Sequence, residues 1–301
     1  MAIIQREWEF HSDTGTQIKG RRWTAEAPKA HVMIVHGLSD HIARYHDFAM
    51  YLAGQGFDVV GYDQCGHGNS GGLRGHAAHF DVLVEDLAQT FQQQLANVEL
   101  PRFLYGHSMG GSVALNFALK KSTEPEFHLD GMIASAPLLR PAHPIPRWKH
   151  ITANTLHLVF PSLRFSTEID PNDLTHDPRV AEELEKDPHW HCKVSARLGV
   201  EMLAAGEWAL ANAELIKVPT LIIHGDQDVL TSLAASREFS QRNRQHCRLI
   251  EFPSMRHELH VELEKLSVWE TVDQWLSEQT NLIQTEIDEP SNGQPSSSLT
   301  T

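Results

Sequence analysis

Two stretches of the chain place a serine between glycines in the pattern G-x-S-x-G, Gly106–Gly110 and Gly68–Gly72. Such a serine can act as a nucleophile when it lies at a sharp turn from a strand into a helix, where its hydroxyl projects above a sheet. Ser108 follows a strand-like run, Arg102–Tyr105, and precedes a segment with helical spacing. Ser70 lies among glycines with no strand-like run directly before it. We therefore predict that Ser108 is a nucleophile and that Ser70 is a turn residue.

A serine hydroxyl needs a histidine to take its proton and a carboxylate to orient that histidine. When the nucleophile occupies a strand-to-helix turn, the acid and then the histidine follow it in the chain. Asp226 and Asp228 follow one late strand-like run, and His257 follows the next, with His260 as its competitor. Either aspartate could instead cap a helix or form a turn, so the residues alone leave the acid open.

The negative charge that develops on the attacked carbonyl oxygen needs two backbone amides. One amide belongs to Met109, the residue after the nucleophile. The second is expected from Leu38, because the pair His36–Gly37 ends an early strand-like run and the glycine lets the backbone turn. The alternative for this segment is a plain turn.

The elements that would position these residues alternate along the chain. Short apolar runs bounded by Gly, Asp or Pro suit strands that are buried on both faces. These runs are residues 31–35, 57–62, 102–105, 129–134, 219–224 and 248–252. Segments with helical spacing lie between and after them, at residues 45–53, 82–95, 112–120, 233–242 and 262–278. The alternation predicts an α/β protein with a mostly parallel sheet, and residues 6–10 and 17–23 would add an antiparallel hairpin at its edge.

One stretch, residues 137–218, interrupts this alternation with a Pro-rich beginning and helical pieces rich in Leu, Trp and Phe. We interpret it as a helical cap inserted between two parts of the core, residues 1–136 and 219–283, because ligands of α/β sheets bind above the carboxyl ends of the strands. The alternative is a separate helical domain without a role in binding. Residues 284–301 are polar and are expected to be a disordered tail.

Composition excludes several classes of function. The formal net charge of −14 opposes binding to nucleic acid. Three widely spaced cysteines favour a reducing compartment over a disulfide framework. The charged first residues and the absence of an apolar run of about 20 residues predict neither a secretory signal nor a membrane-spanning segment, so a cytoplasmic location is expected. Among the 20 histidines, the pairs His76/His79 and His189/His191 lack a partner motif for a metal and are expected to be surface or loop residues.

Taken together, these motifs resemble those of monoacylglycerol lipases and related lysophospholipases. The first segment, residues 36–45, resembles their H-G-x-x-E-H…R-Y stretch, although Asp40 stands where the family has Glu. Four more segments are similar to family motifs, namely Asp63–Ser70, Gly106–Gly111, Gly225–Asp228 and His257–His260. The resemblance covers roughly residues 10–280, and the combination is far more specific than any single motif.

The resemblance implies an α/β-hydrolase fold and a carboxylic-ester hydrolase that forms an acyl-enzyme on lipid-like esters, above all monoacylglycerols, without cofactor or metal. It favours Asp228 as the acid and His257 as the base. It also implies that the acyl chain lies under the cap and that the alcohol contacts Asp40, Arg44 and His260. Among the apolar residues of the cap, Phe160 and Leu163 are candidates for contact with the chain.

Other functions of the same fold remain as alternatives. They are a lysophospholipase, a general carboxylesterase, a peptidase, a thioesterase and an acyltransferase. A peptidase would need a cap carboxylate for the substrate amine, and Glu182, Glu183, Glu185 and Glu207 are available. A non-catalytic binding protein is disfavoured by the intact set of candidate catalytic residues, and an aspartate-nucleophile dehalogenase by Ser108. The expected partners are a small lipid ester and, transiently, lipid surfaces; the oligomeric state does not follow from the sequence.

Overall fold

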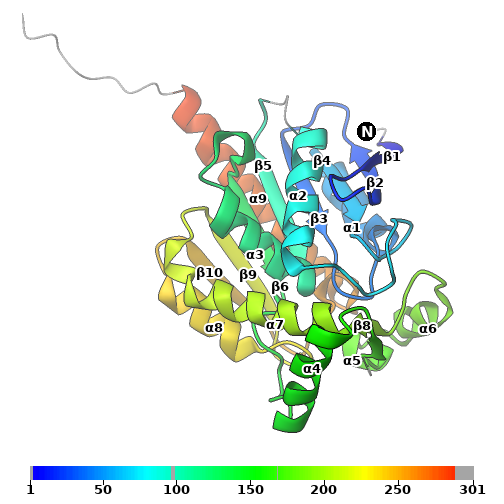
Figure 1. Ribbon diagram of the computed structural model, residues 1–301. Coiled ribbons are helices and arrows are strands. Elements are labelled where there is room, and N and C mark those ends of the chain that lie inside the picture. The colour runs from blue at the N-terminus through cyan, green and yellow to red at the C-terminus, as the bar shows by residue number, and fades with distance from the viewer. Residues whose placement is uncertain (1–2, 96–98, 168, 289–301) are drawn as a thin grey trace, which may run out of the picture.

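A central sheet of eight strands organises the computed structural model, which describes residues 3–95, 99–167 and 169–288 (Figure 1). The strand order is β1-β2-β4-β3-β5-β6-β9-β10. The strands are β1 (Ile4–His11), β2 (Gln17–Thr24), β3 (Ala30–Val35), β4 (Phe57–Asp63), β5 (Arg102–His107), β6 (Gly131–Ser135), β9 (Thr220–Gly225) and β10 (Cys247–Phe252). The six strands from β4 to β10 are parallel, and β2 pairs antiparallel with both β1 and β4. The predicted parallel sheet and its edge hairpin are confirmed.

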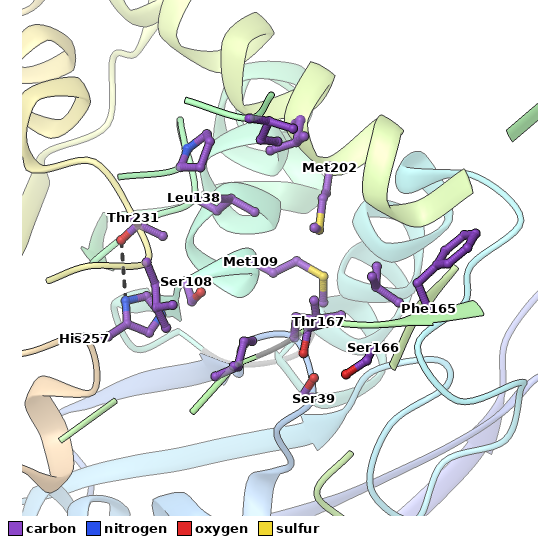
Figure 2. Close-up of a pocket in the computed structure, with 18 of the residues that line it drawn as sticks. Ser39, Ser108, Met109, Leu138, Phe165, Ser166, Thr167, Met202, Thr231 and His257 are labelled. Carbon is purple, nitrogen blue, oxygen red and sulfur yellow. Dashed lines mark hydrogen bonds between the residues drawn. The ribbon is translucent and has the colours of Figure 1, made fainter. Parts of the chain in front are cut away.

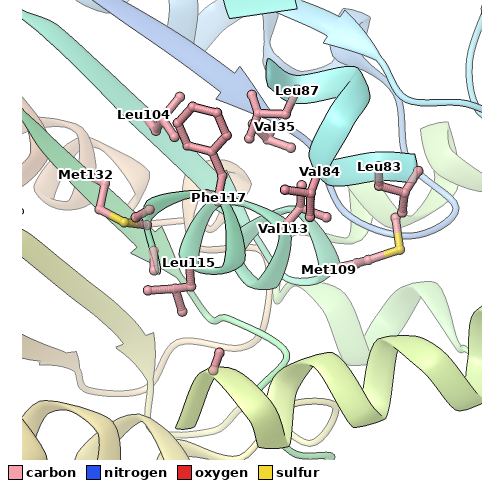
Figure 3. Close-up of a cluster of buried hydrophobic side chains, with 14 of the residues drawn as sticks. Val35, Leu83, Val84, Leu87, Leu104, Met109, Val113, Leu115, Phe117 and Met132 are labelled. Carbon is pink, nitrogen blue, oxygen red and sulfur yellow. The ribbon is translucent and has the colours of Figure 1, made fainter. Parts of the chain in front are cut away.

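Both faces of the sheet are covered because successive side chains of a strand point to opposite sides. In β3, Val32 and Ile34 face one apolar cluster, and Met33 and Val35 face the other. The first cluster is closed by α1 (His46–Gly54) and α9 (Lys265–Asp288), and the second by α2 (Phe80–Leu95), α3 (Met109–Lys121) and α8 (Leu233–Arg242). Figure 3 shows the side of α3, where Val113 and Phe117 pack against leucines of α2 and residues of the strands. This packing fixes the carboxyl end of β5 and the start of α3.

Residues 137–218, the predicted insertion, gather at one end of the sheet (Figure 1). It contains the helices α4 (Arg147–Val159), α5 (Pro171–Leu174), α6 (Pro178–Lys186) and α7 (Ala196–Ala211). Two short antiparallel strands, β7 (Arg164–Ser166) and β8 (Lys193–Ser195), also occur there. The sequence did not predict them, because three residues are too few to show an alternating pattern. Helix α7 packs on α3 of the core, and α4 packs on α7.

The end of the chain departs from one expectation. Helix α9 continues to Asp288, so residues 284–288 are helical and the predicted start of the disordered tail is wrong. Ile283 packs against the apolar cluster beneath the helix, which anchors α9 up to its last turns. The rest of the predicted tail, residues 289–301, lies outside the described residues. Among the helices that the structure describes, none is long and apolar enough to cross a bilayer.

Candidate active site

Ser108 lies between the end of β5 and the start of α3, in a strained conformation with φ 55° and ψ −119°. Glycines permit this turn because nothing larger fits around it. A Cβ atom on Gly106 would lie 2.5 Å from the carbonyl oxygen of Gly110, and one on Gly110 would lie 2.2 Å from that of Val35. The predicted strand-to-helix turn is therefore present, with the Ser108 side chain at a pocket.

Ser70, the competing serine, lies in a turn after β4 and is buried. Its hydroxyl donates to the carbonyl oxygen of Asp63 at 2.6 Å and accepts from the amide of Lys19 at 2.9 Å. These bonds close the loop against β2. They also occupy the hydroxyl, as the interpretation of Ser70 as a turn residue requires.

The structure brings His257 to Asp228, with Nδ1 of the imidazole 2.7 Å from Oδ2 of the carboxylate. The other carboxylate oxygen accepts from the amides of Leu230 and Thr231 at 2.7 and 3.0 Å. Asp226 instead is exposed and accepts a bond from the amide of Ser254 at 2.7 Å. The geometry thus separates two aspartates that the residue pattern alone left equivalent.

Burial and charge act in opposition on this pair. Burial disfavours the charged form of both groups, but their attraction and hydrogen bonds prevail. The pKa of Asp228 is consequently held far below its usual range, chiefly by the charge of His257. Burial alone would lower the pKa of His257, yet the carboxylate of Asp228 raises it above the ordinary value. This arrangement stabilises an imidazolium, as a general base in acyl transfer requires.

Leu38 and Met109 both line the pocket beside Ser108. Met109 is the first residue of α3, so its amide has no acceptor within the helix and points to the end where the helix dipole favours negative charge. Gly37, just before Leu38, approaches the nucleophile so closely that a Cβ atom there would lie 3.2 Å from Cβ of Ser108. The two amides proposed for the oxyanion therefore belong to segments that converge on Ser108.

A buried cluster of charge lies next to these segments. Arg44 donates to Oδ1 of Asp40 at 2.9 Å and forms two bonds with Glu258, at 2.7 and 2.5 Å. Arg44 and Asp40 do not form a surface ion pair, because Asp40 and Glu258 are buried and the side chain of Arg44 is only 10% exposed. Asp40 and Glu258 line the pocket, whereas Arg44 lies behind them. Glu258 was missed, and its only signal in the sequence is its position next to His257.

His260 is a buried residue of the short 3-10 helix η4 (Leu259–Val261) and does not belong to the helical surface. Its ring stacks on Tyr45 with 4.3 Å between the centroids. Burial lowers the pKa of His260 to about 4, so the ring is neutral at pH 7. His260 is not among the residues that line the pocket, so its expected contact with the substrate alcohol stays a prediction.

The pocket has a volume of about 580 Å³ and extends from Ser108 and His257 to Phe165 (Figure 2). Its wall is mostly apolar and comes largely from the insertion, including Ile145, Trp148, Leu156, Phe165, Trp190 and Met202. Phe160 and Leu163 do not line it and are 58% and 44% exposed. Their expected contact with an acyl chain therefore stays a prediction, and their exposure places them on the outer surface. Within the described residues, no three histidine, cysteine or acidic side chains form a group that could hold a metal.

Comparison with known proteins assigns the class. Residues 26–264 match the family described as serine aminopeptidase, S33. An abhydrolase domain-containing protein of Dictyostelium discoideum is 32% identical over 93% of this chain, which spans only 29% of that longer protein. A monoacylglycerol lipase of Mycolicibacterium smegmatis is 29% identical over 92% of this chain and 98% of its own length. The crystal structure of a Paleococcus ferrophilus monoacylglycerol lipase superposes with a TM-score of 0.78 and 26% identity, covering 93% of this chain and 100% of that one.

The chain therefore belongs to the serine aminopeptidase S33 family, whose fold here is that of an α/β-hydrolase. Within that family it is a monoacylglycerol lipase-like enzyme of the serine hydrolase class.

Proposed function

We propose that this enzyme hydrolyses monoacylglycerols through an acyl-enzyme, with Ser108, His257 and Asp228 as its catalytic triad. The observation that carries the proposal is the buried 2.7 Å contact between His257 and Asp228 beside a serine held at a strained turn. Nε2 of His257 takes the proton as Oγ of Ser108 bonds to the acyl carbon, and the amides of Leu38 and Met109 bind the oxyanion. Collapse breaks the ester C–O bond, and His257 returns the proton to the glycerol oxygen. Water then releases the fatty acid by the same steps.

The insertion serves as a cap over the acyl chain in this proposal. The apolar wall that it contributes, with Trp148, Leu156 and Met202, continues away from Ser108. Each methylene that moves from water into such a wall contributes about 0.8 kcal/mol. The enzyme should accordingly prefer medium and long chains to acetate.

Asp40 is the group proposed to recognise the alcohol part. It lines the pocket, and its Oδ2 is buried with no hydrogen-bond partner among the described residues. A carboxylate accepts hydrogen bonds only, so it suits the free hydroxyls of a glycerol ester. Arg44 contributes by holding Oδ1 of Asp40, and His260 supports Tyr45 behind this cluster.

Contact with lipid surfaces is also proposed, because α4 and the residues after it expose an apolar face. The exposed side chains are Trp148, Ile151, Leu158, Val159, Phe160 and Leu163. Such a patch next to the pocket would let a substrate pass from an aggregate into the site. The three free cysteines support a cytoplasmic location.

An aminopeptidase is the second candidate, favoured by one observation. The free oxygen of Asp40 could accept a bond from a substrate ammonium as well as from a hydroxyl. The cap carboxylates considered for this role, Glu182, Glu183, Glu185 and Glu207, do not line the pocket. Hydrolysis of amino acid p-nitroanilides faster than of matched esters would favour this candidate.

The test compares a 1-monoacylglycerol with the ethyl ester of the same acid in the wild type, Ser108→Ala and Ser70→Ala. The wild type should favour the glycerol ester, Ser108→Ala should lose hydrolysis while remaining folded, and Ser70→Ala should keep most activity. Labelling with a fluorophosphonate and peptide mapping identifies the nucleophile. A label on another serine would refute the triad, and equal rates on both esters would leave a general carboxylesterase.

A further inference from the structure

His224 is a second histidine in contact with Asp228, and it lies on the side of the carboxylate away from the pocket. It is the fifth residue of β9 and is completely buried. Its Nε2 lies 3.1 Å from Oδ2 of Asp228, the same oxygen that contacts His257. Nothing in the motif pattern indicated this residue, because only its position before Gly225 relates it to the acid.

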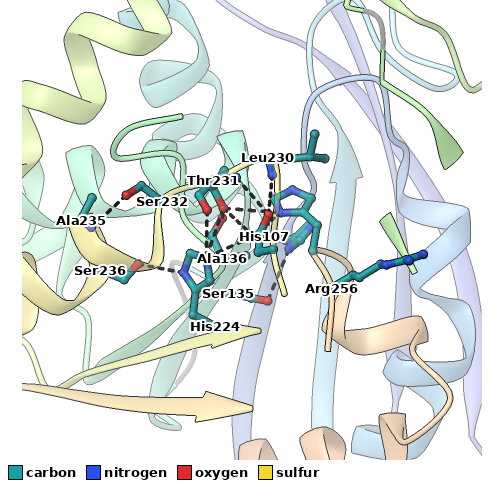
Figure 4. A network of polar contacts seen from close by, with 12 residues as sticks. His107, Ser135, Ala136, His224, Leu230, Thr231, Ser232, Ala235, Ser236 and Arg256 are labelled. Carbon is teal, nitrogen blue, oxygen red and sulfur yellow. Dashed lines mark hydrogen bonds and ion pairs between the residues drawn. The ribbon is translucent and has the colours of Figure 1, made fainter. Parts of the chain in front are cut away.

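The other ring nitrogen of His224 has a partner of its own. Nδ1 lies 2.9 Å from Oγ of Ser236, a fully buried residue of α8 (Figure 4). The hydroxyl of Ser236 can donate to Nδ1, which leaves the proton of a neutral imidazole on Nε2. Asp228 and the carbonyl oxygen of Thr231, 3.3 Å from Nε2, are both acceptors, so that tautomer suits both contacts. The hydroxyl of Thr231 lies 3.5 Å from Nε2 and donates to Oδ2 of Asp228 at 2.7 Å. A buried group in such a network has a defined orientation.

We propose that His224 is a positioning residue for the catalytic acid. Ser236 fixes the ring of His224 so that its Nε2–H group donates to Oδ2 of Asp228. The carboxylate charge of Asp228 is then shared between His224 and His257. The proposal rests on the roles proposed above for Asp228 and His257. It extends the triad backwards to a chain of five side chains, from Ser236 through His224, Asp228 and His257 to Ser108.

The physical consequence follows from charge. A neutral donor on the carboxylate weakens the attraction between Asp228 and the imidazolium of His257. Without that donor, more negative charge faces His257, and its protonated form becomes more stable. The acidic limb of the pH–rate profile should then move to higher pH, because the base must be neutral to accept a proton.

Several other titratable groups lie near His224 and His257. The ring of His107 lies 4.7 Å from that of His257, and burial keeps the pKa of His107 well below its usual value. Glu258 and Asp40 also act on His257, and His260 is a neighbour of the same cluster. Glu251 lies opposite His224 on β10 and is paired with Arg237. None of these residues is changed in the test.

The test measures the pKa of His257 directly, by NMR of ring-labelled histidine in the full chain, with the resonance assigned through His257→Gln. In His224→Leu the pKa of His257 should rise by about 0.5 to 1 unit, and kcat/KM at neutral pH should fall about tenfold with KM nearly unchanged. In His224→Gln, whose amide keeps a donor near the position of Nε2, both quantities should return toward the wild type.

A matched control separates positioning from simple support of the fold. His31 is another buried strand histidine, and its Nδ1 lies 2.7 Å from Oδ2 of Asp58, away from the pocket. His31→Leu should lower stability and leave the pKa of His257 unchanged. If His224→Leu does not fold, Ser236→Ala provides the measurement, with a smaller rise in the same direction.

An unchanged pKa of His257 in folded His224→Leu or Ser236→Ala would overturn the inference. The NMR readout does not depend on ester hydrolysis. A wild type without esterase activity would therefore refute the proposed function, while a shift in His224→Leu would still support the role of His224.

Discussion

Arg44 and Glu258 are joined by two hydrogen bonds although 214 positions separate them, with Nη1 2.7 Å from Oε1 and Nη2 2.5 Å from Oε2. Their side chains are only 10% and 4% exposed. Arg44 belongs to the short 3-10 helix η1 (Ile42–Tyr45) that follows the Leu38 segment, and Glu258 follows His257. The pair thus connects the segment of the proposed oxyanion hole to that of the proposed base.

Replacing Arg44 with Met should destabilise the enzyme strongly. Asp40 and Glu258 would remain buried without their cation, and such a broken pair costs about 3–5 kcal/mol. The control is Arg237→Met, because the pair of Arg237 with Glu251 is 49% and 36% exposed and should be worth less than about 1 kcal/mol. Urea unfolding measures both free energies. Equal losses would contradict the assignment of Arg44 to a buried, interdependent cluster.

Replacing Asp228 with Asn should lower kcat by about 10⁴, because an amide at this position favours the wrong tautomer of His257. The same change at Asp226 removes only an exposed bond to the amide of Ser254 and should cost little activity. Steady-state kinetics on one soluble ester is sufficient. A large loss at Asp226 with a small one at Asp228 would reverse the two roles.

The two leucines of α4 distinguish the pocket from the outer surface. Leu156 lines the pocket, whereas Leu158 is an exposed residue two positions later. Leu156→Asp should reduce kcat/KM for a p-nitrophenyl decanoate more than for the acetate, since the charge faces the acyl chain. Leu158→Asp should leave that ratio unchanged for substrates below their aggregation limit. Parallel loss of both substrates in Leu156→Asp would mean that the insertion does not cover the acyl chain.

Asp86 of α2 is predicted to make stability depend on pH. It is buried, and burial raises its pKa to about 6 although a hydrogen bond with Ser12 opposes that rise. An unfolded Asp titrates near 3.9, so the folded state binds the proton more tightly. Protonated Asp86 makes its full contribution to the free energy of unfolding below about pH 4, and this contribution is lost as the pH rises through about 6.

Asp86→Asn removes this titration while keeping the size of the side chain. The change that the mutation makes in the free energy of unfolding should therefore be more favourable at pH 8 than at pH 4 by about 2–3 kcal/mol. Urea unfolding at both pH values measures this difference. An equal effect at the two pH values would show that Asp86 is solvated or paired in the native state.

Several features of the structure followed from local pattern. A strand was predicted at residues 31–35, within the observed Ala30–Val35, because the run is mostly apolar, as burial on both faces of a parallel sheet requires. The Ser108 turn was predicted because the glycines around it and the change from strand to helix are adjacent in the chain. The exposure of Phe160 and Leu163 was not predicted, because an apolar residue in a helical insertion can face either the pocket or the solvent.

By itself, the amino-acid sequence determined the parallel sheet, the nucleophile turn and the small set of side chains that could act with Ser108, since each depends on residues that are close together in the chain. The family resemblance favoured Asp228 over Asp226, and the tertiary structure shows its contact with His257. Only the tertiary structure decided that Glu258 pairs with Arg44 and that His224 lies behind the acid. Those contacts join β9, β10 and the loops that follow the strands. Their distances depend on how the sheet twists and how its helices pack, which no short stretch of sequence specifies.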